Sequence, residues 1–300
     1  MFTKLLIEQH FHGAYGIDFN NAGISDIVDL SYQIKKEGIG AIFPTLVTDS
    51  IENIKRQISV IKKASKKQSS DCAKILGVHL EGIFLNPKKC GIHDNRYFLK
   101  PTIENFSLIE DDFIKIVTVA PEFCDTNFFK YLKNKDIKIQ AGHCIGGDLS
   151  FCDGVTHTFN AMEGISHRSK STLLSSLIND DIYNEIICDG VHVSDDALKL
   201  LFKAKPYDKI LLVSDCLPCT HSNVKEFIFA GSKIYYDGDT AKSKSGTLAG
   251  SSKLLPDIVK ILFTKGLFNI EYINNPYKYH KIDIDGQIEW DEHFNIVKVS

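Results

Sequence analysis

The sequence predicts an α/β protein: a (β/α)8 barrel, that is, a TIM barrel, with a reduced β appendage at its C-terminal end. Three observations support this fold. Short apolar, β-branched runs recur eight times, helical patterns fill many of the gaps, and polar residues able to do chemistry follow the ends of the runs. A doubly wound open sheet is the alternative, but no GxGxxG fingerprint follows the first run.

The eight runs have the length of strands. Most are apolar on both faces, as parallel strands are when helices cover the sheet on each side. They cover residues 4–8, 41–46, 75–80, 114–120, 137–141, 155–159, 185–188 and 210–214.

Helical patterns separate several of these strands. Isoleucines recur at intervals of three and four over residues 51–61, and Asp49 with Glu52 is placed as a capping pair before them. Residues 173–178 carry another apolar face, and Ser194 is placed to cap a third helix. Strands and helices therefore alternate along the chain as a barrel requires.

The pattern changes after the eighth strand. We expect a hairpin turned at Gly231 and Ser232, a loop of small residues, an apolar helix, and a tail of two or three short strands. These cover residues 227–236, 245–251, 254–263 and 282–299. We therefore divide the chain into a barrel over residues 1–270 and a β appendage over residues 271–300.

Charge and composition exclude several classes of protein. The formal net charge is -3, and the lysines of residues 62–67 are most simply the solvated side of a helix, so nothing indicates a nucleic-acid-binding face. No apolar run approaches the roughly 18 residues of a membrane span. The N-terminus lacks the pattern of a signal peptide. We expect a cytoplasmic protein without nucleic-acid or membrane partners.

The eight cysteines are scattered, and reduced thiols are expected in a chain of this length. Cys216 and Cys219 form one CxxC motif. A structural zinc site would need a second such pair, and thioredoxin-like chemistry would need a different context, so both remain minor alternatives.

The residues that can bind a metal follow the ends of the predicted strands, which gather at one face of a barrel. His10 and His12 lie two apart on the first strand, so their side chains point the same way. The later strands deliver Glu81, His143, His157, Asp189, His192 and Asp215. Imidazoles with carboxylates suit a divalent ion such as zinc or ferrous iron. A divalent ion acidifies water and a nearby carboxylate can carry its proton, which is the machinery of metal-assisted amide hydrolysis.

These residues also carry a family resemblance. The chain resembles the N-acetylglucosamine-6-phosphate deacetylase family of the amidohydrolase superfamily. The matching stretches follow the family's order over nearly the whole chain, at residues 10–14, 43–48, 79–82, 84–89, 120–122, 142–143, 156–157, 159–162, 189–193, 215 and 246–251.

The resemblance implies one catalytic acid/base and five metal-ligating positions. Asp215 matches the acid/base. The principal ligands are Glu81, His143 and His157, and the pair that serves a second ion in some members is His10 and His12.

The resemblance also implies a substrate site in a homodimer. The substrate-binding positions are Ile92, His93, Asn160, Ala161, Asp189, His192, Leu248, Ala249 and Gly250. Arg168 matches an arginine that reaches the phosphate of a substrate bound in the neighbouring subunit. The implied reaction removes acetate from N-acetyl-D-glucosamine 6-phosphate and leaves D-glucosamine 6-phosphate. An amidohydrolase for another N-acyl hexosamine phosphate or a cyclic amide, and a non-catalytic sugar-phosphate binder, remain alternatives.

The sequence departs from the family pattern in three respects: a single residue shortly after Glu81, two cysteines beside site residues, and the segment before the first strand. Ile83 stands where the family usually has proline, and Cys144 and Cys216 follow His143 and Asp215, where small or hydroxyl residues are more usual. The family carries a longer segment before the first strand, which pairs with the tail. We therefore expect that small β domain to be reduced to the tail or absent here.

Overall fold

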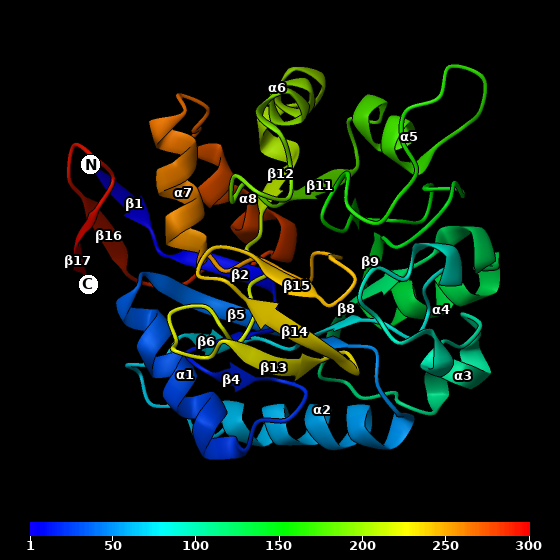
Figure 1. The fold of residues 1–300 in the computed structure, drawn as a ribbon, viewed down its shortest axis with the longest axis horizontal. Coiled ribbons are helices and arrows are strands. Elements are labelled where there is room, and N and C mark those ends of the chain that lie inside the picture. Colours follow the sequence, from blue (N-terminus) through cyan, green and yellow to red (C-terminus); the bar gives the residue numbers. More distant parts are fainter.

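Eight parallel strands form a nearly closed barrel in the computed structural model, which describes residues 1–300 (Figure 1). This confirms the predicted fold class. The strands are β2 (Leu6–Phe11), β5 (Ile39–Val47), β7 (Val78–Glu81), β8 (Ile114–Val119), β9 (Lys138–Ala141), β10 (Gly154–Val155), β11 (Tyr183–Ile186) and β12 (Ile210–Leu212). A two-residue strand, β6 (Lys74–Ile75), also pairs with β5.

Eight helices accompany the strands: α1 (Ile24–Lys36), α2 (Ile51–Ser65), α3 (Ile103–Ser107), α4 (Thr126–Asn134), α5 (Thr172–Ile178), α6 (Asp195–Ala204), α7 (Leu255–Thr264) and α8 (Glu271–His280). Four short 3-10 turns are η1 (Pro87–Lys89), η2 (Asn95–Tyr97), η3 (Pro121–Phe123) and η4 (Tyr207–Lys209).

The helix caps test two sequence predictions. Ser194 caps α6, because its hydroxyl accepts a bond of 3.3 Å from the backbone amide of Ala197. The predicted cap of α2 was one residue too early: Ser50 accepts from the Asn53 amide at 3.2 Å. Asp49 instead accepts a bond of 2.5 Å from the Asn53 side chain, so the carboxylate supports the same turn without capping it.

The first predicted strand combined two elements. The barrel strand is β2, whereas β1 (Phe2–Lys4) pairs antiparallel with β16 (Gln287–Trp290). In β1 only Thr3 is buried, which suits a sheet covered on one face, whereas every residue of β2 is buried, as in a barrel wall. Shorter strands than predicted also place His157 and Asp189 after β10 and β11 rather than within or next to them.

The barrel closes through a polar seam between its first and last strands. Asp215 donates its backbone N–H to the His10 carbonyl, and His12 donates to the Cys216 carbonyl, both at 2.9 Å. Lower in the seam, the buried Glu8 carboxyl accepts from the backbone N–H of His10 at 3.2 Å and of Ser214 at 3.1 Å. Closure therefore places Asp215 beside the two histidines of β2.

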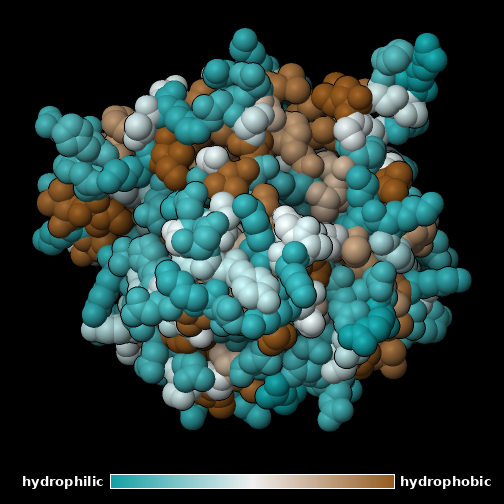
Figure 2. Space-filling model, viewed as in Figure 1, coloured by the Kyte–Doolittle hydropathy of each residue, from teal (hydrophilic) through white to brown (hydrophobic).

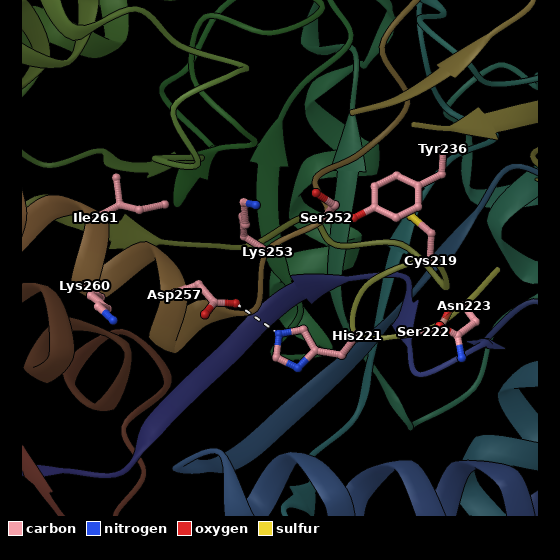
Figure 3. A pocket seen from close by; sticks show the side chains of 10 residues that line it. All are labelled: Cys219, His221, Ser222, Asn223, Tyr236, Ser252, Lys253, Asp257, Lys260 and Ile261. Carbon is pink, nitrogen blue, oxygen red and sulfur yellow. Dashed lines mark hydrogen bonds and ion pairs between the residues drawn. The ribbon is translucent and has the colours of Figure 1, made fainter. Parts of the chain in front are cut away.

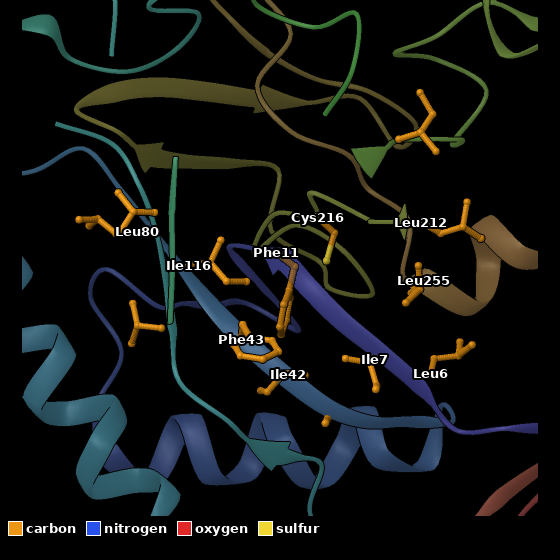
Figure 4. Packing of buried hydrophobic residues seen from close by; sticks show 14 of the residues in the cluster. Leu6, Ile7, Phe11, Ile42, Phe43, Leu80, Ile116, Leu212, Cys216 and Leu255 are labelled. Atoms are coloured by element: carbon orange, nitrogen blue, oxygen red, sulfur yellow. The ribbon is translucent and has the colours of Figure 1, made fainter. Parts of the chain in front are cut away.

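The core is continuous through the barrel. Side chains from neighbouring strands, including Phe11, Ile42, Leu80 and Ile116, pack together in Figure 4 and are fully buried or nearly so. Outside the strands, α1 and α2 lie along one side of the barrel (Figure 1). Both helices present buried isoleucines at helical spacing, and in α2 this confirms the pattern predicted over residues 51–61.

Two small antiparallel sheets are added to the barrel, with a two-stranded pair, β3 (Gly13–Ala14) and β4 (Ile17–Asp18). The first sheet, β13 (Glu226–Phe229), β14 (Ser232–Tyr236) and β15 (Ala241–Ser243), lies across the front of the barrel in Figure 1. Its hairpin turns at Ala230 and Gly231, one residue earlier than predicted, because Phe229 pairs with Ser232. Both turn residues have positive φ, +49° and +78°, as tight hairpin turns of this kind require.

The second sheet joins the two chain ends. It contains β1, β16 and β17 (Ile296–Val299), so the predicted tail strands are present and the N-terminal strand completes them. Hydrophobic side chains gather over this sheet at the left of Figure 2, where the surrounding face is mostly hydrophilic. Helix α8, from residue 271 on, packs against β2 and β12, and the division of the chain at residue 270 stays a prediction. None of the helices combines the length and the apolarity that crossing a membrane would take.

Trp290 anchors the terminal sheet. Its side chain is 2% exposed, donates Nε1–H to the Thr3 hydroxyl at 2.9 Å, and stacks on Phe294. We expect Trp290→Ala to lower the free energy of unfolding by about 3–5 kcal/mol, measured by circular dichroism in urea, because it leaves a large cavity. Val297→Ala on the same sheet, at a residue 60% exposed, is the control and should change it by less than about 0.5 kcal/mol. Equal small effects would mean that this sheet contributes little to barrel stability.

Candidate metal centre

Three side chains meet at the mouth of the barrel around one oxygen of Glu81. Glu81 follows Leu80 at the end of β7, and His143 and His157 follow β9 and β10. Glu81 Oε1 lies 2.9 Å from His157 Nε2 and 3.3 Å from His143 Nε2, and the two imidazole nitrogens lie 3.0 Å apart. All three residues are buried. Two ring nitrogens and a carboxylate oxygen therefore face a common point.

The other oxygen of Glu81 faces a second pair of imidazoles. Glu81 Oε2 lies 3.4 Å from His10 Nε2 and 3.2 Å from His12 Nε2. Asp215 Oδ1 lies 3.0 Å from His12 Nε2 and 3.6 Å from His10 Nε2. Glu81 thus stands between two groups of donors, one oxygen toward each.

The donor atoms fit a divalent ion. Ligands at the usual zinc–nitrogen and zinc–oxygen distances stand about 3.3 Å apart in a tetrahedron. The separations within the Glu81, His143 and His157 group are 2.9–3.3 Å, and His10 Nε2 is buried without a hydrogen-bond partner. Both groups, as well as His10 with His79 and Glu185, bring three possible ligand atoms close together. His79 is otherwise engaged, because its ring nitrogens contact the Gln9 carbonyl at 3.0 Å and the Thr118 hydroxyl at 2.8 Å.

The buried carboxylates of the centre favour positive charge on the groups around them. Burial by itself raises the pKa of Glu81 and of Asp215, but the histidine hydrogen bonds and charges around them hold both pKa values below the ordinary range. Burial lowers the pKa of His10, yet the Glu81 carboxylate and its neighbours raise it well above the usual value. Burial lowers the pKa of His143 to about 4, which keeps that ring neutral and free to ligate. A proton or a metal ion can supply the missing charge.

Backbone strain aims several of these side chains into the mouth. His143, His157 and Asp215 have left-handed φ values of +47°, +30° and +52°. Such conformations cost about 1–3 kcal/mol each for residues other than glycine and cluster at functional sites. The strands end two or three residues before these positions, so the strand alternation no longer determines where the side chains point.

Acceptors behind three of the imidazoles orient the rings. His12 Nδ1 contacts the Thr45 carbonyl at 3.2 Å, His143 Nδ1 contacts the Lys89 carbonyl at 2.8 Å, and His10 Nδ1 contacts the Glu185 carboxylate at 3.1 Å. These contacts place N–H on Nδ1 and leave Nε2 for the centre.

A cavity of about 210 Å³ opens above the two groups of donor atoms. Thirteen predicted residues line it: His12, Glu81, Ile92, His93, His143, His157, Asn160, Ala161, His192, Asp215, Leu248, Ala249 and Gly250. Sequence reasoning missed Gly91, Phe229 and Thr247. Gly91 and Thr247 adjoin predicted residues, but Phe229 belongs to the hairpin sheet and no sequence pattern indicated it. The centroids of the Phe229 and His12 rings lie 5.1 Å apart.

Three predicted residues lie outside the cavity wall. His10 is fully buried beneath it. Asp189 lies behind His192, with its Oδ2 2.7 Å from His192 Nδ1. Arg168 is exposed in a loop that lines a separate surface hollow of about 880 Å³, so the structure does not bring it to the cavity of its own chain.

Other sites offer less for catalysis. A surface hollow of about 540 Å³ beside α7 contains one ring–carboxylate pair, His221 with Asp257 at 3.3 Å (Figure 3). Cys219 also lines this hollow. All eight cysteines are free, and Cys216 donates its thiol to the Gly13 carbonyl at 3.2 Å inside the seam.

Comparison with known proteins places this site in context. No family model matches the sequence. The chain is 32% identical over 260 residues to the N-acetylglucosamine-6-phosphate deacetylase of Bacillus subtilis, covering 82% of this chain and 65% of the relative. It is 25% identical to the N-acetylgalactosamine-6-phosphate deacetylase of Escherichia coli, covering 82% and 68%. The chain therefore spans about two thirds of the length of these curated relatives.

Solved structures share the fold over the whole chain. An N-acetylglucosamine-6-phosphate deacetylase from Pasteurella multocida superposes with a TM-score of 0.90 at 23% identity, covering 100% of this chain and 84% of that one. A variant of the Mycobacterium smegmatis enzyme in complex with N-acetyl-D-glucosamine-6-phosphate gives 0.87 at 19% identity, covering 100% and 85%. The sequence similarity and the shared fold together show that the chain belongs to the N-acetylglucosamine-6-phosphate deacetylase family of the amidohydrolase superfamily.

Proposed function

We propose that this protein is a metal-dependent deacetylase that converts N-acetyl-D-glucosamine 6-phosphate into D-glucosamine 6-phosphate and acetate. The observation that carries the proposal is the arrangement of Asp215 and Glu81 against four imidazoles at the floor of a cavity. The family relatives support the class of substrate, and the sugar phosphate bound by the Mycobacterium smegmatis variant supports its identity.

We assign the ligands that the resemblance implies. Glu81, His143 and His157 would hold the principal ion, and His10 and His12, whose Nε2 atoms face Glu81 Oε2, would hold a second. Zinc or iron suits nitrogen and carboxylate donors of this kind. A divalent ion bound there supplies Lewis acidity, which lowers the pKa of water and polarises the acetamide carbonyl.

Asp215 acts as the general base and then the general acid. Its Oδ1 is within 3.0–3.6 Å of His12 and His10, and the residue lines the cavity, so the carboxylate lies where substrate and donor atoms meet. It accepts a proton from the attacking water as the C–O bond forms. It then gives that proton to the sugar nitrogen as the C–N bond breaks, which releases the amine and leaves acetate.

Two further histidines orient the substrate. His192 Nε2 lines the cavity and is buried without a hydrogen-bond partner, whereas its Nδ1 is held by Asp189. His93 is held by the Thr48 hydroxyl at 2.9 Å and lies 3.6 Å from Glu81 through Nε2. Either ring can hydrogen-bond the sugar or the developing oxyanion. Ile92, Asn160, Ala161 and residues 248–250 complete the sugar site.

The phosphate needs a cation that the cavity lacks, because none of its lining residues is lysine or arginine. Arg168 from a second copy of the chain would meet this need with its guanidinium fork, which matches phosphate oxygens. We therefore propose a homodimer in which each Arg168 serves the neighbouring site. The cytoplasmic location expected from the sequence stays a prediction.

A specific observation favours a second candidate substrate. The Escherichia coli relative acts, by its name, on N-acetylgalactosamine 6-phosphate, which differs only in the configuration at one hydroxyl.

Acetate release from the two N-acetylhexosamine 6-phosphates tests the activity. We expect turnover of the gluco epimer with a higher kcat/KM than the galacto epimer, loss of turnover after chelation, and recovery with zinc or ferrous iron. A higher kcat/KM for the galacto epimer would replace the substrate. Tight binding of either sugar phosphate without metal or turnover would support the non-catalytic binder.

Asp215→Asn tests the proton carrier. We expect kcat to fall by roughly 10²–10⁴-fold because the amide cannot shuttle a proton. The variant should keep its fold and the ion held by Glu81, His143 and His157, checked by circular dichroism and metal analysis. Asp153→Asn, at a carboxylate that pairs with Lys133 away from the cavity, is the control. Near-normal turnover by Asp215→Asn would exclude the role.

Complementation tests Arg168. We expect Arg168→Met to raise KM at least 10-fold with little change in kcat, and Lys170→Met in the same loop to change neither. Mixed dimers of Arg168→Met and Asp215→Asn chains should regain low-KM activity, because one site then has an intact Asp215 and a partner arginine. Absence of recovery in mixed dimers confirmed by mass spectrometry would contradict action between subunits.

A further inference from the structure

Glu185 is a buried carboxylate that none of the assigned roles uses. It lies in β11, is fully buried, and does not line the cavity. Its only ion-pair partner is His10, since no lysine or arginine approaches it. A buried carboxylate without such a partner is expensive to maintain, so its contacts call for an explanation.

The contacts come from three sides of the barrel. Glu185 Oε2 lies 3.1 Å from His10 Nδ1 and accepts from the His157 backbone N–H at 3.2 Å. Glu185 Oε1 accepts from the side-chain amides of Gln9 at 2.5 Å and Gln140 at 3.2 Å. The Gln9 amide is itself fixed, because its oxygen accepts from His280 Nε2 at 2.8 Å. Three N–H donors thus converge on Glu185 besides the His10 ring.

This arrangement determines which nitrogen of His10 is available. A carboxylate surrounded by donors acts as an acceptor, so His10 Nδ1 must carry a hydrogen. His10 Nε2 then faces Glu81 Oε2 and Asp215 Oδ1, 3.4 and 3.6 Å away, and is the ring nitrogen left to bind an ion in place of a proton. That nitrogen is the one left without a hydrogen-bond partner in the buried site.

His10 differs from the other three imidazoles in this support. Neutral backbone carbonyls hold His12 and His143, and His157 Nδ1 has no partner. A carboxylate behind a ligating imidazole fixes its tautomer and raises its basicity. We propose that Glu185 is a positioning residue that fixes the Nδ1–H form of His10 and so builds the second ion position. The inference rests on the proposed two-ion site but is independent of the substrate.

Zinc binding by Glu185→Gln tests the inference without any assay of activity. Glutamine removes the negative charge behind His10 and cannot accept hydrogen bonds at both oxygen positions, which weakens the preference of the ring for the Nδ1–H form. We expect the metal-stripped parent to take up two zinc ions in calorimetric titration. The variant should bind its second ion about 10–100-fold more weakly, the usual effect of losing such a partner. Metal analysis after dialysis should then find two ions in the parent and one in the variant.

Gln140→Met is the matched control. It removes one buried hydrogen bond to Glu185 but leaves the Glu185–His10 contact intact, so it should retain two zinc ions even if it is less stable. If Glu185→Gln does not fold by circular dichroism, Glu185→Asp, which keeps the charge but withdraws it from His10, serves with the same expectation.

Each outcome separates this inference from the proposed function. Two ions bound with unchanged affinity by the folded Glu185 variant would overturn the role of Glu185 and leave the deacetylase proposal standing. Equal loss of the second ion in Gln140→Met would also overturn it, since general disruption of the buried network would then suffice. Failure of the parent to bind any zinc or ferrous iron would instead overturn the metal-dependent function itself.

Discussion

The arrangement of the site follows from one buried carboxylate, that of Glu81. Each of its oxygens faces a different pair of imidazoles. With Asp215 and Glu185, it makes a cluster of negative charge inside a barrel, without a lysine or arginine beside it. In a low-dielectric interior, such a cluster is stable only with compensating cations. The same demand explains the raised pKa of His10 and favours the binding of divalent ions.

Barrel closure serves this cluster directly. The backbone bonds of the seam join the end of β2 to the residues after β12, and so bring Asp215 against the histidines of the first strand. The left-handed conformations of His143, His157 and Asp215 then turn side chains inward where the strands stop. A continuous apolar core below holds these strand ends rigid, which suits a site that must keep several polar atoms within about 0.5 Å of a productive geometry.

The residues that depart from the family pattern, Ile83, Cys144 and Cys216, all fit the fold as buried side chains. Ile83 is fully buried with φ at +61°, a conformation closed to proline, and donates its N–H to the Thr48 hydroxyl at 3.2 Å. Cys144 and Cys216 are buried, and their thiols contact the Thr172 hydroxyl and the Gly13 carbonyl. Burial raises the pKa of the Cys144 thiol to about 12, so it is inert at neutral pH and serves as a small packed residue.

The barrel and most of the residues around its mouth can be predicted from local sequence patterns. Apolar runs separated by helical patterns specify parallel strands, and the ends of parallel strands meet at one face, so Glu81, His143 and Asp215 could be placed together before any coordinates. The same patterns also predict the tail strands, because their alternation and spacing are local properties.

The residues that support the site from behind could not be predicted in this way, because they meet only when distant segments fold together. Gln9 and Glu185 lie 176 positions apart in the chain, and strand periodicity describes each as one more buried residue. Phe229 reaches the cavity because the hairpin sheet folds across the barrel, and residues 2–4 leave the barrel strand to pair with the tail. These contacts join segments that are far apart in the chain. Their free energy depends on both segments at once, so the pattern of one segment alone does not predict them.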